Sequence, residues 1–163
     1  MPKKGTTKYL SDRQEKEVAE EINGKQVIAS GALWSMKADV RNDRLLVECK
    51  ITEKEYYRLT LATWKKIEEQ AVRDSIRYPL MCIDDKVKGE FYRYAVLDPY
   101  EIGYTRDFPP EEGILRKQIS NLAKSVVVPN KDNEKCFYYN SFKVLLVLPW
   151  EDFKEFAKKK GLI

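Results

Sequence analysis

Apolar residues near the start of the chain fall at helical spacing. The apolar stripe of this segment consists of Val18, Ala19 and Ile22. Ser11 and Gln14 have the spacing of a capping box, in which side chains satisfy the free N–H groups at the start of a helix. Asn23-Gly24 suits a left-handed helix end. The pattern therefore predicts a helix from Ser11 to Asn23. Residues 1–10, which carry lysines and no acid, are expected to form a loose basic arm.

Apolar and polar residues then begin to alternate, which indicates strands. The expected strands cover 26–30, 36–41, 44–51 and 80–83, with a loop containing Gly31 after the first of them. The second and third form a hairpin that turns at Asn42-Asp43. Thr52 and Glu55 form a second capping box, so we expect a long helix from Thr52 to about Arg77, ended by Pro79.

The second half of the chain continues with strands and helices. The expected elements are strands over 89–97, 125–128 and 143–148, a short helix over 114–124, and a final amphipathic helix from Pro149-Trp150. The stretch 98–112 contains three prolines and two tyrosines, and we expect a long loop or mobile flap there. This order of elements predicts a single domain over 1–163 of the α/β class, with a mixed β-sheet flanked by helices.

The composition excludes several kinds of catalytic site. The chain contains no histidine, which rules out histidine triads, histidine-ligated metal nucleases and histidine general bases. Any hydrolysis must therefore rely on carboxylates, lysine and a metal bound by oxygen. The net charge of +4 favours a polyanionic partner only weakly.

Composition also predicts the compartment. With 43% hydrophobic and 34% charged residues, the 163-residue chain is typical of one soluble domain. The start of the chain does not resemble a signal peptide, and the longest apolar run, residues 144–148, is too short to cross a bilayer. Cys49, Cys82 and Cys136 are odd in number and lie in strand-like segments, which favours reduced core thiols in a cytoplasmic protein.

An acidic residue two positions before a lysine is the candidate motif for catalysis, and it occurs three times. The three instances are Glu48-Cys49-Lys50, Asp84-Asp85-Lys86 and Asp152-Phe153-Lys154. The Asp152 instance falls in the predicted last helix, where residues two apart do not face each other. The Asp84 instance ends a strand, but the nearest upstream acid, Asp74, belongs to the predicted long helix. Only the first instance therefore builds a site.

Two-residue alternation places Asp39, Glu48 and Lys50 on one face of the predicted hairpin. With a turn at Asn42-Asp43, Asp39 would lie opposite Leu46 and diagonal to Glu48. Diagonal neighbours on one face are roughly 7–8 Å apart at the backbone, which is close enough for two carboxylates to share a cation. A longer turn would shift this register.

Two further residues are candidates for the same site. Glu15 lies on the apolar stripe of the first helix and could complete a metal shell if that helix packs over the hairpin. Gln70 is a candidate to position a phosphate or a water. The hairpin group and Gln70 each have an ordinary alternative. A hairpin face with acidic and basic residues is common on protein surfaces, and an isolated glutamine is often a solvated helix residue. A set of tyrosines could likewise stack on DNA bases or simply pack: Tyr92, Tyr94, Tyr100 and Tyr104.

Phosphodiester hydrolysis explains why these residue types belong together. Magnesium prefers hard oxygen ligands and keeps several waters, so one or two carboxylates suffice to hold it. The metal polarises the phosphate and acidifies bound water. Lys50 could orient or deprotonate that water and offset the charge of the transition state.

The order of these elements resembles the Holliday junction resolvases of archaea and phages, which belong to the PD-(D/E)XK nuclease superfamily. The similarity covers residues 11–84, namely a helix with Glu15-Lys16-Glu17, then Ser30-Gly31, then Asp39, then Glu48-Cys49-Lys50 followed by a helix. The resemblance implies a restriction-endonuclease-like fold. It also implies a homodimer that nicks two strands of a four-way DNA junction symmetrically, using Mg²⁺ or, as a substitute, Mn²⁺.

Carried over by position, the resemblance implies that Glu15, Asp39 and Glu48 are metal ligands and that Lys50 is the catalytic lysine. It places Ser30 near the phosphate. Asp39 follows alanine instead of proline, a departure that is common in the superfamily. Residues 85–163 have no counterpart in the resemblance and are expected to extend the same domain, as candidates for a substrate flap and a dimer contact. The apolar candidates for that contact are Phe137, Tyr138, Phe142 and Trp150.

Three functions remain open at this point. The first is a structure-selective DNA endonuclease, and the second is a nuclease of the same superfamily that acts on linear duplex, flaps or ends. The third is a DNA-binding module with a degenerate site, which the intact set of Asp39, Glu48 and Lys50 disfavours. In each case Lys3 and Lys4 of the basic arm are candidates to contact phosphates.

Overall fold

The computed structural model describes residues 6–27, 38–54, 56–76, 78–104, 115–118, 125–128, 136–139 and 143–163. Ser30, Lys3 and Lys4 lie outside the described residues. In chain order the elements are α1 (Thr7–Glu21), β1 (Lys25–Gln26), β2 (Val40–Arg41), β3 (Leu45–Thr52), β4 (Tyr57–Thr60), α2 (Leu61–Arg73), β5 (Tyr78–Val87), β6 (Glu90–Leu97), β7 (Leu115–Gln118), β8 (Ser125–Val128), β9 (Cys136–Tyr139), β10 (Val144–Pro149) and α4 (Trp150–Lys159).

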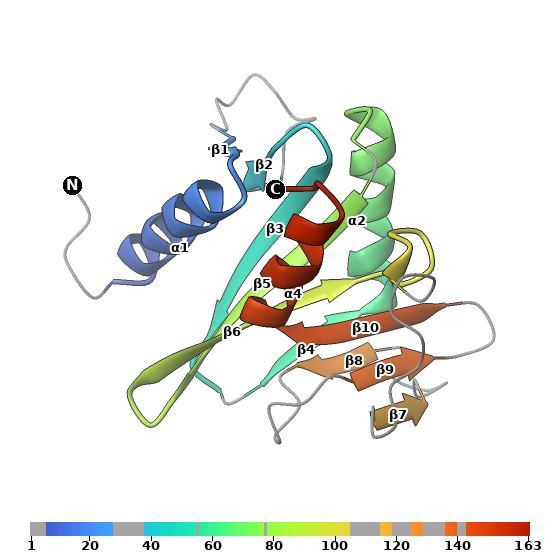
Figure 1. Cartoon of the computed structure of the whole chain (residues 1–163). Helices are drawn as coiled ribbons and strands as arrows, with labels where there is room; N and C mark the ends of the chain where they lie inside the picture. Colours follow the sequence, from blue (N-terminus) through green and yellow to red (C-terminus); the bar gives the residue numbers. More distant parts are fainter. Residues whose placement is uncertain are drawn as a thin grey trace.

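The described strands form one large sheet and one small one (Figure 1). Within the described residues the large sheet has eight strands in the order β1-β2-β3-β5-β6-β10-β9-β7, and β4 pairs with β8 separately. The β3–β5 and β7–β9 pairs are parallel and the other pairs are antiparallel. The predicted α/β class and the mixed sheet flanked by helices are therefore confirmed.

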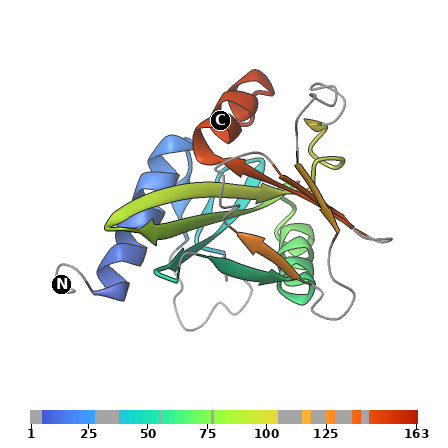
Figure 2. The same ribbon diagram turned by 90° about the horizontal axis from the view of Figure 1, so that it is seen from below.

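Helices cover both faces of the sheet, with α1 and α4 on one face and α2 on the other (Figure 2). Val47 of β3 packs in one core cluster with Val18 of α1 and Phe153 of α4. On the opposite face, Met81 of β5 packs with Trp64 of α2. This division follows from the alternation of side chains along each strand. No helix among the described residues has the length and apolar character needed to span a membrane.

Both capping boxes predicted from the sequence are wrong as helix starts. The α1 helix begins at Thr7, because the Thr6 hydroxyl accepts the N–H of Tyr9 at 3.3 Å, so residues 7–10 of the expected arm are helical. The α2 helix begins only at Leu61, where Thr60 accepts the N–H of Thr63 at 3.1 Å. The segment after Thr52 forms a turn and then β4. The predicted end of the first helix is confirmed, since Asn23 adopts a left-handed conformation with φ of 54°.

The second half differs from the prediction in its short elements. Residues 115–118 form β7 where a helix over 114–124 was expected, and β9 and β4 were not foreseen. The pairing of β7 with β9 joins segments about twenty residues apart, so short-range periodicity does not reveal it. The predicted strands over 125–128 and 143–148 and the final helix match β8, β10 and α4.

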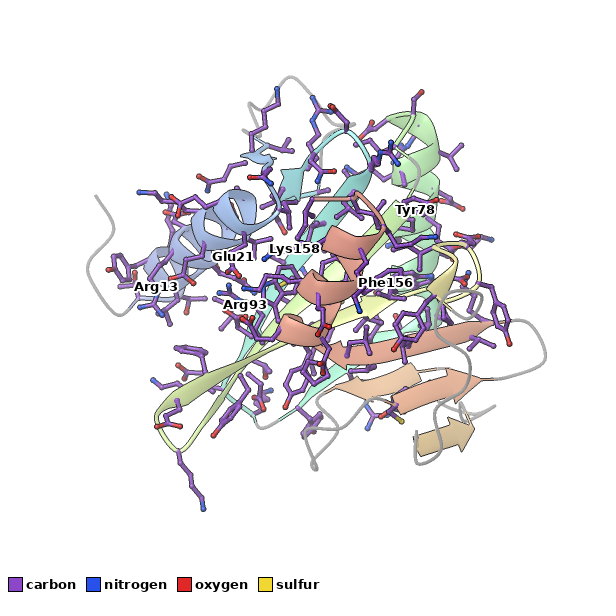
Figure 3. All side chains as sticks on the ribbon, viewed as in Figure 1. Arg13, Glu21, Tyr78, Arg93, Phe156 and Lys158 are labelled. Carbon is purple, nitrogen blue, oxygen red and sulfur yellow. The ribbon has the colours of Figure 1, made fainter. Side chains whose placement is uncertain are left out.

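Arg93 of β6 is the centre of an ion-pair network that attaches α1 to the sheet (Figure 3). Its guanidinium donates to both carboxylate oxygens of Asp84, at 2.7 and 2.9 Å. It also donates to Glu17 at 2.8 Å and to Glu21 at 3.0 Å. The Trp150 indole of α4 donates to Glu21 at 3.0 Å, which joins the last helix to the same network. The rotation of α1 about its own axis is thereby fixed by polar contacts as well as by its short apolar stripe.

Candidate active site

Asp39 is held against β3 by its side chain. The β2–β3 ladder pairs Val40 with Val47, and one residue earlier the Asp39 carboxylate accepts the N–H of Cys49 at 2.7 Å. The turn of this hairpin is Asp43-Arg44, because the Asn42 N–H donates to the Leu45 carbonyl at 3.1 Å. The predicted turn at Asn42-Asp43 is therefore wrong by one residue, and the register changes by two residues, which places Asp39 near Glu48 instead of opposite Leu46.

Glu48 and Lys50 lie side by side on β3. The Lys50 Nζ atom is 3.2 Å from the Glu48 Oε1 atom, and the side chains of Lys50 and Glu48 are 39% and 18% exposed. The intervening Cys49 and the preceding Val47 point into the core on the opposite face. The predicted alternation, with the acid and the lysine on one face and the apolar residues on the other, is confirmed.

Glu15 of α1 completes the group of acidic residues. Its carboxylate accepts a hydrogen bond from the Gln26 side chain at 3.4 Å. Burial raises the pKa of Glu15, and the negative charge of Asp39 raises it further. Glu15 in turn contributes to the raised pKa of Glu48. Glu15, Asp39 and Glu48 therefore lie near enough to influence one another's ionisation, and their joint role as metal ligands stays a prediction.

The electrostatics of this group are unbalanced. Burial and then the charge of Asp39 raise the pKa of Glu48 from 4.5 to about 7, although Lys50 acts in the opposite direction. Burial also raises the pKa of Asp39, despite its hydrogen bond from Cys49. Burial is the largest cause of each raised pKa, and neighbouring negative charges add to it for Glu15 and Glu48.

Gln14 was missed as a residue of this region. Its side chain is only 2% exposed, and its Nε2 atom donates to the Lys50 carbonyl at 3.0 Å and to the Cys82 carbonyl at 3.5 Å. Gln14 therefore connects α1 to β3 and β5 one residue before Glu15. The missed signal was a glutamine four residues before Val18, on the face of the helix that packs on the sheet.

Gln70 is buried on α2, beside Ala71, which packs against Leu46 of β3. The solvated alternative for Gln70 is therefore wrong, and its role in positioning a phosphate or water stays a prediction. Of the four tyrosines considered for stacking, Tyr94 and Tyr104 are buried, whereas Tyr92 and Tyr100 are exposed. The three cysteines are free thiols in the core, as predicted.

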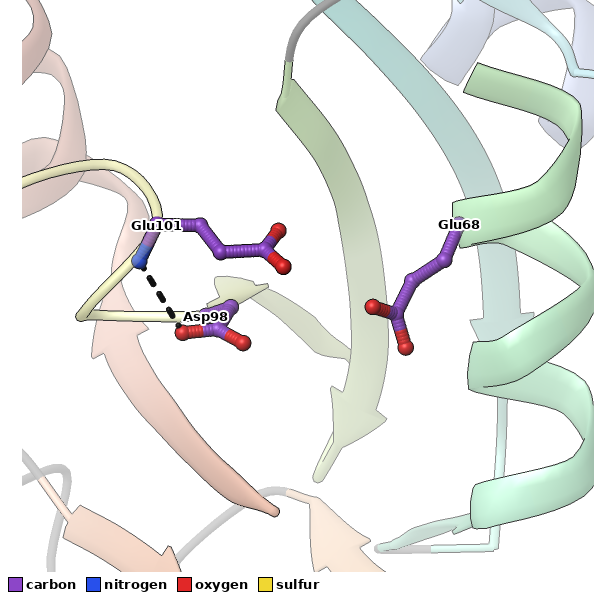
Figure 4. A group of neighbouring side chains, drawn as sticks. All are labelled: Glu68, Asp98 and Glu101. Carbon is purple, nitrogen blue, oxygen red and sulfur yellow. Dashed lines mark hydrogen bonds between the residues drawn. The ribbon is translucent and has the colours of Figure 1, made fainter. Parts of the chain in front are cut away.

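A second acidic group, absent from the sequence predictions, consists of Glu68, Asp98 and Glu101 (Figure 4). Among the described residues, these are the three acidic side chains whose ligand oxygens all lie within 4.8 Å of one another. The Lys143 ammonium lies 2.7 Å from Asp98 and 2.9 Å from Glu68. The other Asp98 oxygen accepts backbone N–H groups, including that of Glu101 at 3.2 Å. Lys143 thus supplies positive charge to two members of this group, whereas in the group around Asp39 the Lys50 ammonium contacts one carboxylate, that of Glu48.

The chain was compared with known proteins. No protein-family model matches it. A search of curated proteins found no significant match.

Proposed function

We propose that this protein is a magnesium-dependent, structure-selective DNA endonuclease of the PD-(D/E)XK type, with a restriction-endonuclease-like core. The observation that carries the proposal is that Glu15, Asp39 and Glu48 influence one another's ionisation and that Glu48 contacts Lys50 at 3.2 Å. Its preferred substrate is a four-way DNA junction, cut by paired symmetric nicks. Consistent with the resemblance of residues 11–84 to junction resolvases, it acts in the cytoplasm as a homodimer.

The residue types of this group suit a magnesium ion. The side chains offer carboxylate oxygens, and the nearby thiols of Cys49 and Cys82 point into the core. Hard oxygen ligands select Mg²⁺ or Mn²⁺ over softer metals. Burial raises the pKa of Asp39 and Glu48, and the charge of Asp39 raises that of Glu48 further, so a divalent cation would stabilise their ionised forms.

Each residue then has a separate part in hydrolysis. A bound ion would polarise the phosphate and make its bound water more acidic. One carboxylate oxygen of Asp39 accepts the Cys49 N–H, so the other oxygen is available to bind the ion. Burial alone would lower the pKa of Lys50, but the charge of Glu48 outweighs this and raises it. Lys50 is therefore an ammonium group that orients the water and stabilises negative charge on the phosphate.

The test is nicking of a labelled four-way junction beside its matching linear duplex, with magnesium or with chelator. Wild type should cut the junction in symmetric pairs, and Glu48→Gln should lower the rate by at least about a hundredfold because it removes a metal ligand. Glu155→Gln is the control, since Glu155 is an exposed carboxylate of α4 that has no part in the proposed site. Equal cutting of the duplex would replace the junction by linear DNA, flaps or ends as substrate. Binding without cutting of either DNA would indicate a non-catalytic module.

A further inference from the structure

The β5–β6 hairpin continues beyond both of its neighbours in the sheet. Pairing of β5 with β3 ends at Asp85, which is the partner of Thr52, and pairing of β6 with β10 ends at Tyr94. Residues 86–91 therefore pair only with each other in the described part of the sheet. Figures 1 and 2 show this hairpin projecting from the body of the molecule alongside the first turns of α1. A projecting two-stranded hairpin is only marginally stable in water, so its length needs a reason.

The turn of this hairpin carries a lysine that the backbone disfavours. Lys88 and Gly89 have φ angles of 50° and 84°, so both adopt left-handed conformations in a two-residue turn. Asparagine, aspartate and glycine are preferred at the first position of such a turn, because other side chains are strained there. Lys88 is exposed. Its charge is thus presented at the outermost point of the hairpin at a conformational cost.

Cationic and aromatic groups gather around this lysine. The ring of Phe91 has the Lys86 ammonium 5.7 Å and the Arg13 guanidinium 6.0 Å from its centre. Tyr92 is 41% exposed. The nearby acids are exposed as well: Glu90 accepts from the Tyr92 hydroxyl at 3.3 Å, and Glu53 lies 3.7 Å from Lys86. Over residues 86–91 the two lysines outweigh the single acid, Glu90.

The hairpin also lies in line with the candidate active site. Lys50 pairs with Ile83, so Lys86 and Lys88 are three and five residues further along β5. At about 3.3 Å per residue these positions lie about 10 and 16 Å beyond Lys50 in the strand direction. Side chains alternate along β5, so Lys86 shares the α1 face with Asp84, opposite the face of Lys50, whereas Lys88 lies in the turn beyond the strand. A DNA strand rises about 3.4 Å per nucleotide, so a strand with a phosphate at Lys50 reaches the turn at Lys88 in about five nucleotides.

We propose that the tip of the β5–β6 hairpin, residues 86–91, binds the phosphate backbone of the DNA substrate on one side of the scissile phosphate. This inference rests on the proposed nuclease function and names the surface that holds its substrate. Lys86 and Lys88 neutralise phosphates, and a two-stranded ribbon is narrow enough to follow a groove of the duplex. Phosphate binding by Lys88 then explains why a lysine occupies a turn position whose backbone conformation disfavours it.

The test measures DNA affinity without cleavage. Anisotropy of a labelled junction and its duplex is recorded in chelator over a range of salt concentrations. Lys86→Gln with Lys88→Asn should weaken binding roughly tenfold and reduce the salt slope by about one for each phosphate that is no longer neutralised. The matched control is Lys158→Gln with Lys159→Gln, which removes the same charge from exposed residues of α4 and should bind as wild type does.

Lys88→Asn alone separates binding from folding. It creates Asn-Gly, the preferred sequence for this turn, so it should raise the melting temperature while it weakens DNA binding. If wild type binds DNA and the hairpin variants bind equally well, the hairpin proposal is wrong and the proposed nuclease function stands. The hairpin proposal is equally wrong if the α4 control loses as much affinity as the hairpin variants. If wild type binds neither DNA, both proposals fail.

Discussion

The side-chain amide of Gln14 donates to the backbone carbonyl of Lys50 at 3.0 Å, which joins α1 directly to the strand that carries the acid–lysine pair. Glu15 is the next residue of the same helix and Glu48 lies two residues before Lys50. One part-buried hydrogen bond thus connects the two elements that contribute Glu15 and Glu48. In the proposed nuclease it would position these ligands without touching the metal or the substrate.

We predict that Gln14→Leu weakens Mn²⁺ binding about tenfold or more, as the loss of residues that orient metal ligands does elsewhere. The variant should also lose about 1–3 kcal/mol of stability, because it removes the Gln14 hydrogen bonds to two strand carbonyls. Calorimetry with Mn²⁺ and urea unfolding in chelator measure the two effects. In the double-mutant cycle with Glu15→Gln, the effects on metal affinity should not add if Gln14 acts through Glu15. Simple addition would reduce Gln14 to a packing role.

We predict that the ion pairs of Arg93 contribute more to the packing of α1 on the sheet than those of any other described residue. Arg93→Leu leaves Asp84, Glu17 and Glu21 without their shared guanidinium, and Asp84 is only 8% exposed. Removing one partner of a buried ion-pair network costs about 3–5 kcal/mol. Urea unfolding at neutral pH should show this loss. Arg13→Gln, which removes a 3.5 Å contact between half-exposed side chains, should change stability by less than about 1 kcal/mol.

The register of the β2–β3 hairpin illustrates what the sequence could predict. Alternation alone placed Asp39, Glu48 and Lys50 on one face, and a slip of two residues preserves that face. The exact partner of Asp39 depended on Asn42, whose side chain accepts the N–H groups of Arg44 and Leu45 at 2.8 and 2.7 Å. It also donates to Leu162, 120 residues away. A contact of that separation leaves no signal in local spacing.

The helix starts were mispredicted for a related reason. A capping box predicts where a helix can begin, but the Gln14 side chain donates to the carbonyls of Lys50 and Cys82 instead of capping a helix that begins at Ser11. Similarly, Thr52 accepts the N–H of Lys54 at 3.1 Å in a turn, and β4 then pairs with β8, about seventy residues later. Tertiary pairing overrode the local preference in both places.

Ionisation of Glu48 should make the metal-free protein less stable as pH rises. Its pKa is about 7 in the folded protein and near 4.5 when unfolded, so the unfolded chain releases this proton first. The stability contributed by neutral Glu48 is therefore complete below pH 4.5 and is lost as pH rises through 7. Such a difference corresponds to about 3 kcal/mol at most.

Glu48→Gln lacks this ionisation, so in chelator its stability relative to wild type should increase from pH 5 to pH 8. Urea unfolding of both proteins at the two pH values measures the difference. Glu53→Gln, a change at an exposed carboxylate, should keep the pH dependence of wild type. Parallel stability curves for wild type and Glu48→Gln would show that Glu48 is not held in an unfavourable charged environment.

Two acidic groups compete as metal sites, and their charge balance predicts which one binds. The group of Glu68, Asp98 and Glu101 is more compact, yet the Lys143 ammonium contacts two of its members at 2.7 and 2.9 Å. A cation there would have to displace or repel that lysine. In the other group Lys50 contacts one carboxylate, that of Glu48, at 3.2 Å, and burial raises the pKa of both Asp39 and Glu48.

Calorimetry should therefore detect Mn²⁺ binding in wild type that Asp39→Asn abolishes. Asp98→Asn should leave Mn²⁺ binding intact and instead lower stability, because Lys143 loses a charged partner at 2.7 Å. Lys143→Met provides the complementary variant: if the compact group gains Mn²⁺ binding when the ammonium is removed, the lysine is what keeps cations out. Loss of wild-type Mn²⁺ binding in Asp98→Asn, with binding intact in Asp39→Asn, would move the metal to the compact group and remove the basis for the proposed nuclease site.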